Sequence, residues 1–158
     1  MKDISYHVGD ATAPEAPGPK IIVHVCNDIG AWGKGFVMAL SKRWSEPESR
    51  FKAWYRERKS NDFELGAVQF VQVEDDLWVA NMIGQHGLKP TKEGPPIRYN
   101  AVEKCLGKVA KKSKELSASV HMPRIGCGLA GGKWEEMEPI IIRQLSEKDI
   151  TVYVYDRG

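Results

Sequence analysis

The 158-residue sequence lacks several features that would assign a protein to a well-defined class. Its three cysteines, Cys26, Cys105 and Cys127, have no CxxC or zinc-site spacing, and an odd number leaves no complete set of disulfides. They fit reduced thiols in a cytoplasmic protein. No apolar run approaches the length of a membrane span, and no cleavable leader is recognisable, so we expect no membrane partner.

Strong charge and the common nucleotide motifs are also missing. Lys and Arg number 23 against 21 Asp and Glu, so the formal net charge is only +2 and gives no support to nucleic-acid binding. Neither GxGxxG nor GxxxxGKS occurs, which removes the main support for a dinucleotide-dependent dehydrogenase or an ATPase. No cluster of residues has metal-ligand spacing, so we expect neither a metal nor a cofactor.

What the sequence does contain is typical of one globular domain covering residues 1–158, with 42% hydrophobic and 28% charged residues. Apolar patterns of different period alternate along the chain. They predict strands at 3–8, 20–26, 65–74, 77–83, 119–123 and 150–155, and helices from 35, after Pro47, at 97–116 and at 134–145. Such alternation indicates an α/β fold with a mixed sheet between helical layers.

Two glycine-rich segments, each after an expected strand, are the most informative part of the sequence. The first runs from Asn27 to Phe36 and the second from Gly126 to Gly132. Glycine lets backbone N–H groups converge, and a following helix adds a partial positive charge at its N-terminus. One such loop could be an ordinary strand-to-helix turn, whereas two indicate a cleft that holds phosphates.

In the first loop we expect the amides of Gly33, Lys34, Gly35 and Phe36 to wrap a diphosphate, with the Lys34 ammonium available to pair with it. The alternative is that these glycines only permit a tight crossover. In the second loop the small residues would let phosphate and ribose approach closely. Cys127 lies in this loop either as a nucleophile or, as we favour, as a small unreactive thiol.

Five polar or aromatic residues lie near the loops, and four of them have two interpretations each. His24, in an apolar strand, is either a hydrogen-bonded core residue or, at the end of a cleft, a general base or water-orienting group. Asp28 either accepts a proton or caps its loop, and Asp10 either caps a turn or accepts from the exocyclic amine of a base. Trp32 either covers a sugar or fills the base of the loop. His86, in a long polar loop, is expected to be solvated.

Together these segments resemble the macrodomain family, whose members bind ADP-ribose and its derivatives. The resemblance covers nearly the whole chain and is carried by the motifs GDAT at 9–12, HVCN at 24–27, GAWGKG at 30–35, ANMIGQ at 80–85 and PRIGCGLAGGKW at 123–134. It is strongest to the branch of the yeast-type ADP-ribose 1″-phosphate phosphatase and the human terminal ADP-ribose protein glycohydrolase. It implies a three-layer α/β/α fold with a central mixed sheet.

The resemblance also implies roles for individual residues. It places Asp10 and the Ala11 amide at the adenine and Asn27 at the distal ribose. The diphosphate would be held by Gly33 to Phe36 on one side and by Ile125, Gly126, Cys127, Gly128, Leu129 and Ala130 on the other. His24 matches the histidine proposed to act in the phosphatase, with Asp28 assisting.

Gln85 and Ala130 stand where the human glycohydrolase has its catalytic lysine and aspartate, which argues against a lysine-based covalent mechanism. The predicted activity is therefore ADP-ribose binding with hydrolysis of the terminal phosphate of ADP-ribose 1″-phosphate by a monomeric protein. The alternatives are a non-catalytic ADP-ribose reader, a hydrolase that removes ADP-ribose from modified protein or nucleic acid, and a single-strand RNA-binding protein, against which the near-neutral charge counts.

Overall fold

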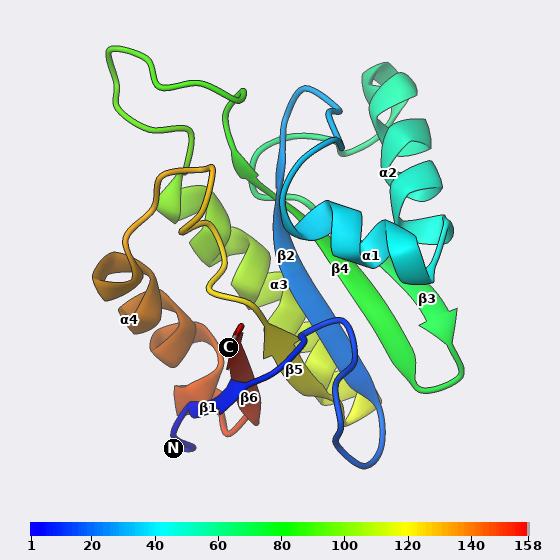
Figure 1. The fold of residues 1–158 in the computed structure, drawn as a ribbon, viewed down its shortest axis with the longest axis vertical. Coiled ribbons are helices and arrows are strands. Elements are labelled where there is room, and N and C mark those ends of the chain that lie inside the picture. Colours follow the sequence, from blue (N-terminus) through cyan, green and yellow to red (C-terminus); the bar gives the residue numbers. More distant parts are fainter. Residues whose placement is uncertain (158) are drawn as a thin grey trace.

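The computed structural model describes residues 1–157 (Figure 1). Its strands are β1 (Ser5–Val8), β2 (Lys20–Asn27), β3 (Val68–Glu74), β4 (Leu77–Gln85), β5 (Ser119–Met122) and β6 (Val152–Asp156). Its helices are α1 (Phe36–Arg43), α2 (Glu46–Arg56), α3 (Tyr99–Leu116) and α4 (Trp134–Gln144), with short 3₁₀ turns η1 (Arg58–Ser60) and η2 (Ser146–Lys148).

The six strands form one mixed sheet in the order β1-β6-β5-β2-β4-β3. Only β3 runs antiparallel to its neighbour, because it joins β4 through the tight turn at Asp75 and Asp76. The pairs β1–β6, β6–β5, β5–β2 and β2–β4 are all parallel, so the carboxyl ends of five strands meet at one edge of the sheet.

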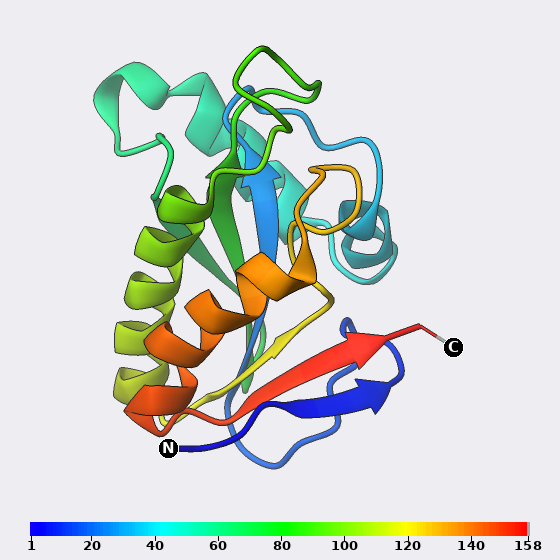
Figure 2. The ribbon, with the colours of Figure 1, turned by 90° about the vertical axis from the view of Figure 1, so that its left-hand side faces the viewer.

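Helices cover both faces of the sheet (Figure 2). The larger apolar core lies between the sheet and α3 with α4, and includes Val23, Leu106 and Ile141. The smaller core lies on the opposite face, against α1 and α2, and includes Leu40 and Phe51. The three-layer α/β/α arrangement with a central mixed sheet is therefore confirmed.

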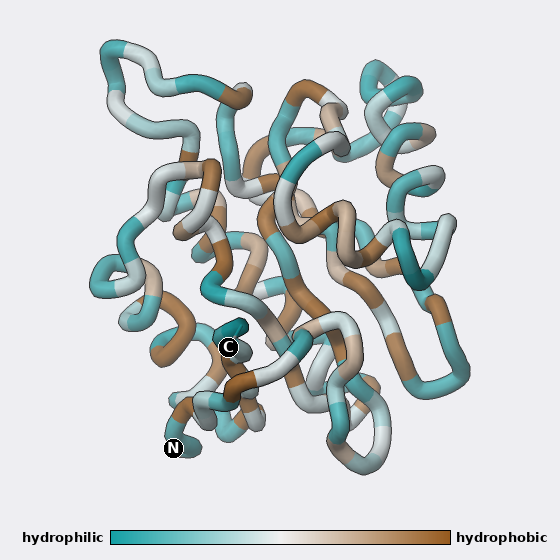
Figure 3. Tube along the Cα trace, viewed as in Figure 1, coloured by the Kyte–Doolittle hydropathy of each residue, from teal (hydrophilic) through white to brown (hydrophobic). Residues whose placement is uncertain are grey.

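Strand β2 shows why both faces need a covering layer. Ile21 and Val23 enter the larger core, while Ile22 and Cys26 enter the smaller one, so successive side chains of the strand are buried on opposite faces. The central strands are mostly apolar and the outer loops mostly polar (Figure 3).

The predicted elements are confirmed, and their ends differ by a few residues. The strand predicted from residue 65 begins at Val68, because Gly66 adopts φ +94° and the Ala67 N–H closes a turn onto the Glu64 carbonyl. No helix in the part of the chain that the structure describes is long and apolar enough to cross a bilayer.

Candidate ligand-binding cleft

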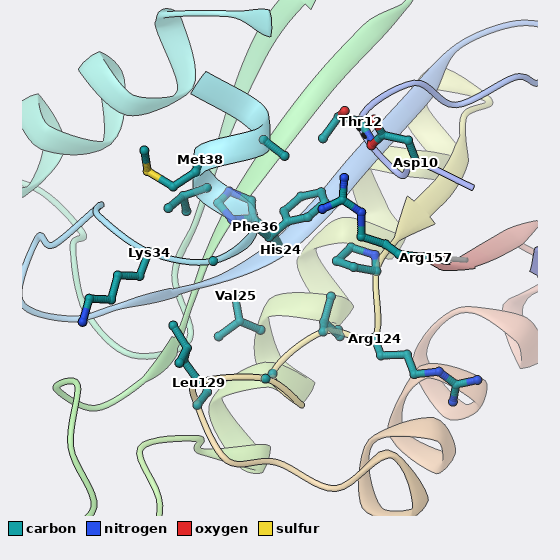
Figure 4. A pocket seen from close by; sticks show the side chains of 18 of the residues that line it. Asp10, Thr12, His24, Val25, Lys34, Phe36, Met38, Arg124, Leu129 and Arg157 are labelled. Carbon is teal, nitrogen blue, oxygen red and sulfur yellow. Dashed lines mark hydrogen bonds between the residues drawn. The ribbon is translucent and has the colours of Figure 1, made fainter. Parts of the chain in front are cut away.

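A cleft of about 920 Å³ opens at the carboxyl edge of the sheet (Figure 4). Five strands contribute to it through their last residues or the loops that follow, as is usual for ligand sites of parallel α/β sheets. Its lining includes Asp10 after β1, Val25 near the end of β2, Gln85 at the end of β4, Gly126 after β5 and Arg157 after β6. Helix α1 forms one wall along its whole length, from Phe36 to Arg43.

The first loop, residues 28–35, is shaped by the side chain of Asn27. Its Oδ1 accepts hydrogen bonds from the N–H groups of Ile29 (3.1 Å) and Ala31 (3.0 Å), and its Nδ2 donates to the Ala31 carbonyl (2.8 Å). Asn27 thus holds the loop in place, and one N–H of its amide has no acceptor among the described residues.

The same loop is anchored in the core by Trp32, which is 7% exposed. The indole packs against the rings of His24 and Phe51, each 5.4 Å away between centroids, and its Nε1 donates to Ser41 Oγ at 2.8 Å. Trp32 therefore fills the base of the loop, one of the two interpretations that the sequence allowed, and its contact with a ligand stays a prediction.

Where the first loop ends, Gly35 starts α1 in a conformation that suits glycine alone, with φ +86° and ψ −146°. Among the described residues, the N–H groups of Phe36 and Val37 have no hydrogen-bond acceptor. They belong to the first turn of a helix, where unpaired amides and the helix dipole together favour an anion. The cleft wall thus presents two free donors at this point.

The second loop, residues 125–132, is shaped by backbone contacts. Gly126 has φ +70°, and a Cβ there would come within 2.6 Å of Ile97 Cδ1. The Gly132 N–H donates to the Gly126 carbonyl at 2.7 Å, and a Cβ on Gly132 would lie 2.5 Å from that oxygen. A side chain at Gly126 would be strained by this φ, and one at Gly132 could be accommodated only if the loop moved.

The two loops face each other across the cleft. A Cβ on Gly35 would lie 3.7 Å from Leu129 Cδ1, and Leu129 is itself 70% exposed over the opening. Within residues 1–157, no acceptor is paired with the N–H groups of Gly126, Gly128, Leu129 and Ala130. The cleft is therefore flanked by unpaired backbone donors on two sides, as the glycine patterns predicted.

The end of the cleft at β1 carries a carboxylate held in a fixed orientation. Asp10 Oδ1 accepts from the N–H (2.9 Å) and hydroxyl (2.7 Å) of Thr12, and Oδ2 lies 3.3 Å from the Arg43 guanidinium. Burial alone would raise the pKa of Asp10, but the bonds from Thr12 and Arg43 lower it overall. Arg157 extends into the cleft nearby, and Lys34 lies at the opposite end (Figure 4).

His24 lies in the floor of the cleft and is only 2% exposed. The Asn81 amide donates to the Pro47 carbonyl and to Gln69 Oε1, so its Oδ1 faces His24 Nε2 at 2.6 Å and can only accept. Nε2 therefore carries the ring proton. Burial lowers the pKa of His24 to about 4, against the opposing effect of the Asn81 bond.

A group with that pKa is a weak base at neutral pH, which disfavours the general-base role for His24. Its contacts with Trp32 and with Phe36, 5.9 Å between ring centroids, instead make it a core residue beneath the first loop. This is the other interpretation that the sequence left open.

Asp28 and His86 form a pair that the sequence does not suggest. His86 Nδ1 lies 2.6 Å from Asp28 Oδ2, and the Gly87 N–H donates to Asp28 Oδ1 at 2.8 Å. Both residues adjoin the Gln85 end of the cleft, since the Asp28 N–H donates to the Gln85 carbonyl at 3.0 Å. His86 was expected to be merely solvated, and that expectation is wrong.

Ten of the predicted site residues line the cleft: Asp10, His24, Lys34, Gly35, Phe36, Ile125, Gly126, Gly128, Leu129 and Ala130. The other six are not among the lining residues, namely Ala11, Asn27, Asp28, Trp32, Gly33 and Cys127. Cys127 is half-buried, its Sγ lies 3.4 Å from the Ile125 carbonyl, and burial raises the pKa of its thiol. That environment fits an unreactive thiol.

Among residues 1–157 no group of three or more His, Cys, Asp or Glu could hold a metal ion.

Comparison with solved structures identifies the fold. A macrodomain protein from Streptomyces coelicolor is 58% identical, with a TM-score of 0.88, and the match covers 99% of this chain and 100% of that one. The chain therefore belongs to the macrodomain family. A protein of unknown function from Bacteroides thetaiotaomicron is 60% identical to this macrodomain, with a TM-score of 0.95 and 98% of each chain covered. No family model matches the sequence.

Curated relatives of this macrodomain have different sizes and names. A chromodomain-helicase-DNA-binding protein 1-like from Danio rerio is 34% identical over 98% of this chain, which spans only 16% of that protein. An ADP-ribose 1″-phosphate phosphatase from Lodderomyces elongisporus is 25% identical, with 97% of this chain and 99% of that protein covered. A DNA ADP-ribosyl glycohydrolase from Mycobacterium bovis is 25% identical over 95% of this chain and 42% of that protein.

Proposed function

We propose that this macrodomain binds ADP-ribose and hydrolyses a bond at the distal ribose, with ADP-ribose 1″-phosphate as its substrate. The observation that carries the binding proposal is the pair of opposed loops, whose unpaired N–H groups flank the cleft on both sides. Backbone donors fixed on two sides suit a diphosphate, because each phosphate oxygen accepts several hydrogen bonds and carries charge.

The ligand would lie along the cleft with its adenine at the Asp10 end. The Asp10 carboxylate, ionised and oriented by Thr12, would accept from the exocyclic amine, beside the amide of Ala11. The amides of Gly33 to Phe36 would hold the diphosphate on one side and those of Gly126 to Ala130 on the other. The distal ribose would then reach the Gln85 end, where the free N–H of Asn27 is available to a hydroxyl.

The relative named as an ADP-ribose 1″-phosphate phosphatase supports the reaction class, because it matches this chain over nearly the full length of both proteins. In this reaction a water molecule attacks the terminal phosphate and ADP-ribose leaves. Holding the diphosphate rigidly places the 1″ position at a fixed point, which lowers the entropic part of the barrier.

Binding is tested by titration calorimetry with ADP-ribose, with AMP as the matched control ligand. We expect ADP-ribose to bind at least about tenfold (~1.4 kcal/mol) more tightly than AMP, because AMP lacks the second phosphate and the distal ribose. Equal affinities, or no heat at millimolar ADP-ribose, would contradict the proposed binding mode.

The reaction is tested by incubating the protein with ADP-ribose 1″-phosphate and following inorganic phosphate. Parallel reactions use ADP-ribosylated protein and ADP-ribosylated DNA and follow release of ADP-ribose. The DNA reaction is included because one relative is named as a DNA ADP-ribosyl glycohydrolase. Release of ADP-ribose without release of phosphate would replace the phosphatase proposal with a glycohydrolase, and binding without any turnover would indicate a reader.

A further inference from the structure

Asp28 and His86 are 58 positions apart in the sequence and meet where the first loop passes the end of β4. His86 Nδ1 lies 2.6 Å from Asp28 Oδ2, and the other carboxylate oxygen accepts from the Gly87 N–H at 2.8 Å. The side chain of Asp28 is 17% exposed and that of His86 is 55% exposed. The carboxylate is thus nearly enclosed, whereas the imidazole is open to solvent.

This geometry determines which nitrogen of His86 can accept a proton. Because a carboxylate only accepts hydrogen bonds, Nδ1 carries the proton in the neutral ring and Nε2 bears the lone pair. A carboxylate behind Nδ1 also stabilises the imidazolium that forms when Nε2 takes up a proton. An exposed imidazole that is oriented from behind in this way can activate a water molecule.

The pair adjoins the end of the cleft where Gln85 stands and where the distal ribose is proposed to lie, just outside the residues that line the cleft. Gln85, which lines the cleft, immediately precedes His86 in the chain, and its carbonyl accepts from the Asp28 N–H at 3.0 Å. The backbone N–H of His86 donates to the Pro96 carbonyl at 2.8 Å, which holds the backbone of His86 in place. Asp10, expected at the adenine, lies after β1 at the far edge of the sheet.

We propose that His86 is the general base of the phosphatase reaction and that Asp28 is its positioning residue. This inference rests on the proposed function. His86 Nε2 removes a proton from water while the water oxygen bonds to the phosphorus of the 1″-phosphate. The P–O1″ bond breaks, the anomeric oxygen leaves with the electron pair and takes a proton from solvent, and His86 later returns its own proton to solvent.

The assignment changes the role of Asp28 and explains why His24 is not required as a base. Both carboxylate oxygens of Asp28 already accept hydrogen bonds, so direct activation of water by Asp28 would first break one of them. His24 has its Nε2 engaged by Asn81 and is buried. Of these three groups, His86 alone combines a free proton-accepting nitrogen with access to solvent.

Steady-state phosphate release from ADP-ribose 1″-phosphate is compared for the wild type, His86→Gln, Asp28→Asn and two controls. The controls are His7→Gln, an exposed histidine on β1, and Asp75→Asn, in the turn between β3 and β4. We expect His86→Gln to lower kcat by about 100-fold and Asp28→Asn by about tenfold, the range of general acid–base catalysis. The KM of both variants should stay within about twofold of the wild-type value, and so should the kcat and KM of both controls. A twofold change corresponds to ~0.4 kcal/mol.

Two further measurements separate a chemical role from a structural one. Added imidazole should restore turnover to His86→Ala, because the side chain that it replaces is exposed, and should not restore turnover to Asp28→Asn. In the wild type, ¹⁵N chemical shifts of the His86 ring should show a protonated Nδ1 and an unprotonated Nε2.

The outcomes distinguish this inference from the proposed function. If the wild type releases phosphate and His86→Gln has an undiminished kcat, the role of His86 is overturned and the phosphatase proposal stands. A His86 ring protonated at Nε2 would have the same consequence. No phosphate release from the wild type overturns both. Loss of turnover in His86→Gln with unchanged KM and rescue of His86→Ala by imidazole supports the assignment.

Discussion

The two loops that flank the cleft hold their amides in place by different means. The first loop depends on side chains, since Asn27 braces it and Trp32 fixes it in the smaller core. The second loop depends on its backbone, since the Gly132 N–H donates directly to the Gly126 carbonyl and a side chain at Gly132 would clash with that oxygen. Substitutions in the first loop should therefore reduce the stability of the fold, whereas those in the second should mainly reduce ligand affinity.

The largest effect predicted by this comparison is that of Trp32→Ala. Removing the indole leaves a cavity between His24 and Phe51, and we expect the free energy of unfolding to fall by about 3–5 kcal/mol. Trp32→Phe, which keeps most of the volume and loses the bond to Ser41, should lose only about 1 kcal/mol. Urea denaturation measures both variants, and equal losses would show that Trp32 does not anchor the first loop.

The second largest effect on the stability of the fold should come from acid, because His24 lies beneath the first loop. The folded protein holds His24 neutral down to its pKa of about 4, whereas the unfolded chain takes up the proton near the ordinary value of 6.5. Protonation then favours the unfolded state, so stability is constant above about pH 6.5 and falls by about 3 kcal/mol as the pH drops to about 4.

The variant His24→Gln isolates this contribution. His121 on β5, whose pKa burial lowers to about 3, adds its own acid dependence in both proteins, so the difference between wild type and variant reports His24. We expect denaturation curves to show a smaller loss of stability between pH 6.5 and 4 in His24→Gln. Identical pH dependence in the two proteins would mean that His24 titrates normally.

The loops and the elements around them could be predicted from the sequence because their signals are local. The continuous apolar run of β2 and the helical spacing of Phe36, Val37 and Leu40 each lie within a single element. The glycines of the second loop are likewise adjacent in the chain, and φ +70° at Gly126 and +77° at Gly131 show why they are needed there.

What the sequence could not show is which distant side chains meet. His24 has its partner Asn81 on the neighbouring strand, 57 residues away, and only that contact determines the tautomer of the ring. The Asp28–His86 pair arises in the same way, since the parallel pairing of β2 with β4 brings their ends together. The burial of Trp32 could not be predicted either, because one indole in a loop has no periodic pattern that reveals it.

Asn27→Ala tests the side-chain brace of the first loop alone. It removes three hydrogen bonds between one amide and the loop backbone, and we expect the free energy of unfolding to fall by about 2 kcal/mol, since each such bond contributes about 1 kcal/mol and the loop is partly solvated. Asn27→Asp, which retains both acceptor bonds, is the matched control and should lose less. If Asn27→Ala is as stable as the wild type, the Asn27 amide does not hold the first loop in place.

Gly132→Ala tests the backbone brace of the second loop, where the smallest effect on stability is expected. The added Cβ would lie 2.5 Å from the Gly126 carbonyl oxygen, so the loop must open and its four unpaired N–H groups lose their alignment. We expect ADP-ribose affinity to fall by about tenfold (~1.4 kcal/mol) while stability falls by no more than about 1 kcal/mol, the value of one hydrogen bond. Gly107→Ala, on α3 where a Cβ meets only Gln144 Oε1 at 3.5 Å, is the control and should leave affinity unchanged. A stability loss in Gly132→Ala as large as that of Trp32→Ala, with unchanged affinity, would reverse the contrast between the loops, because it would make the second loop the structural one.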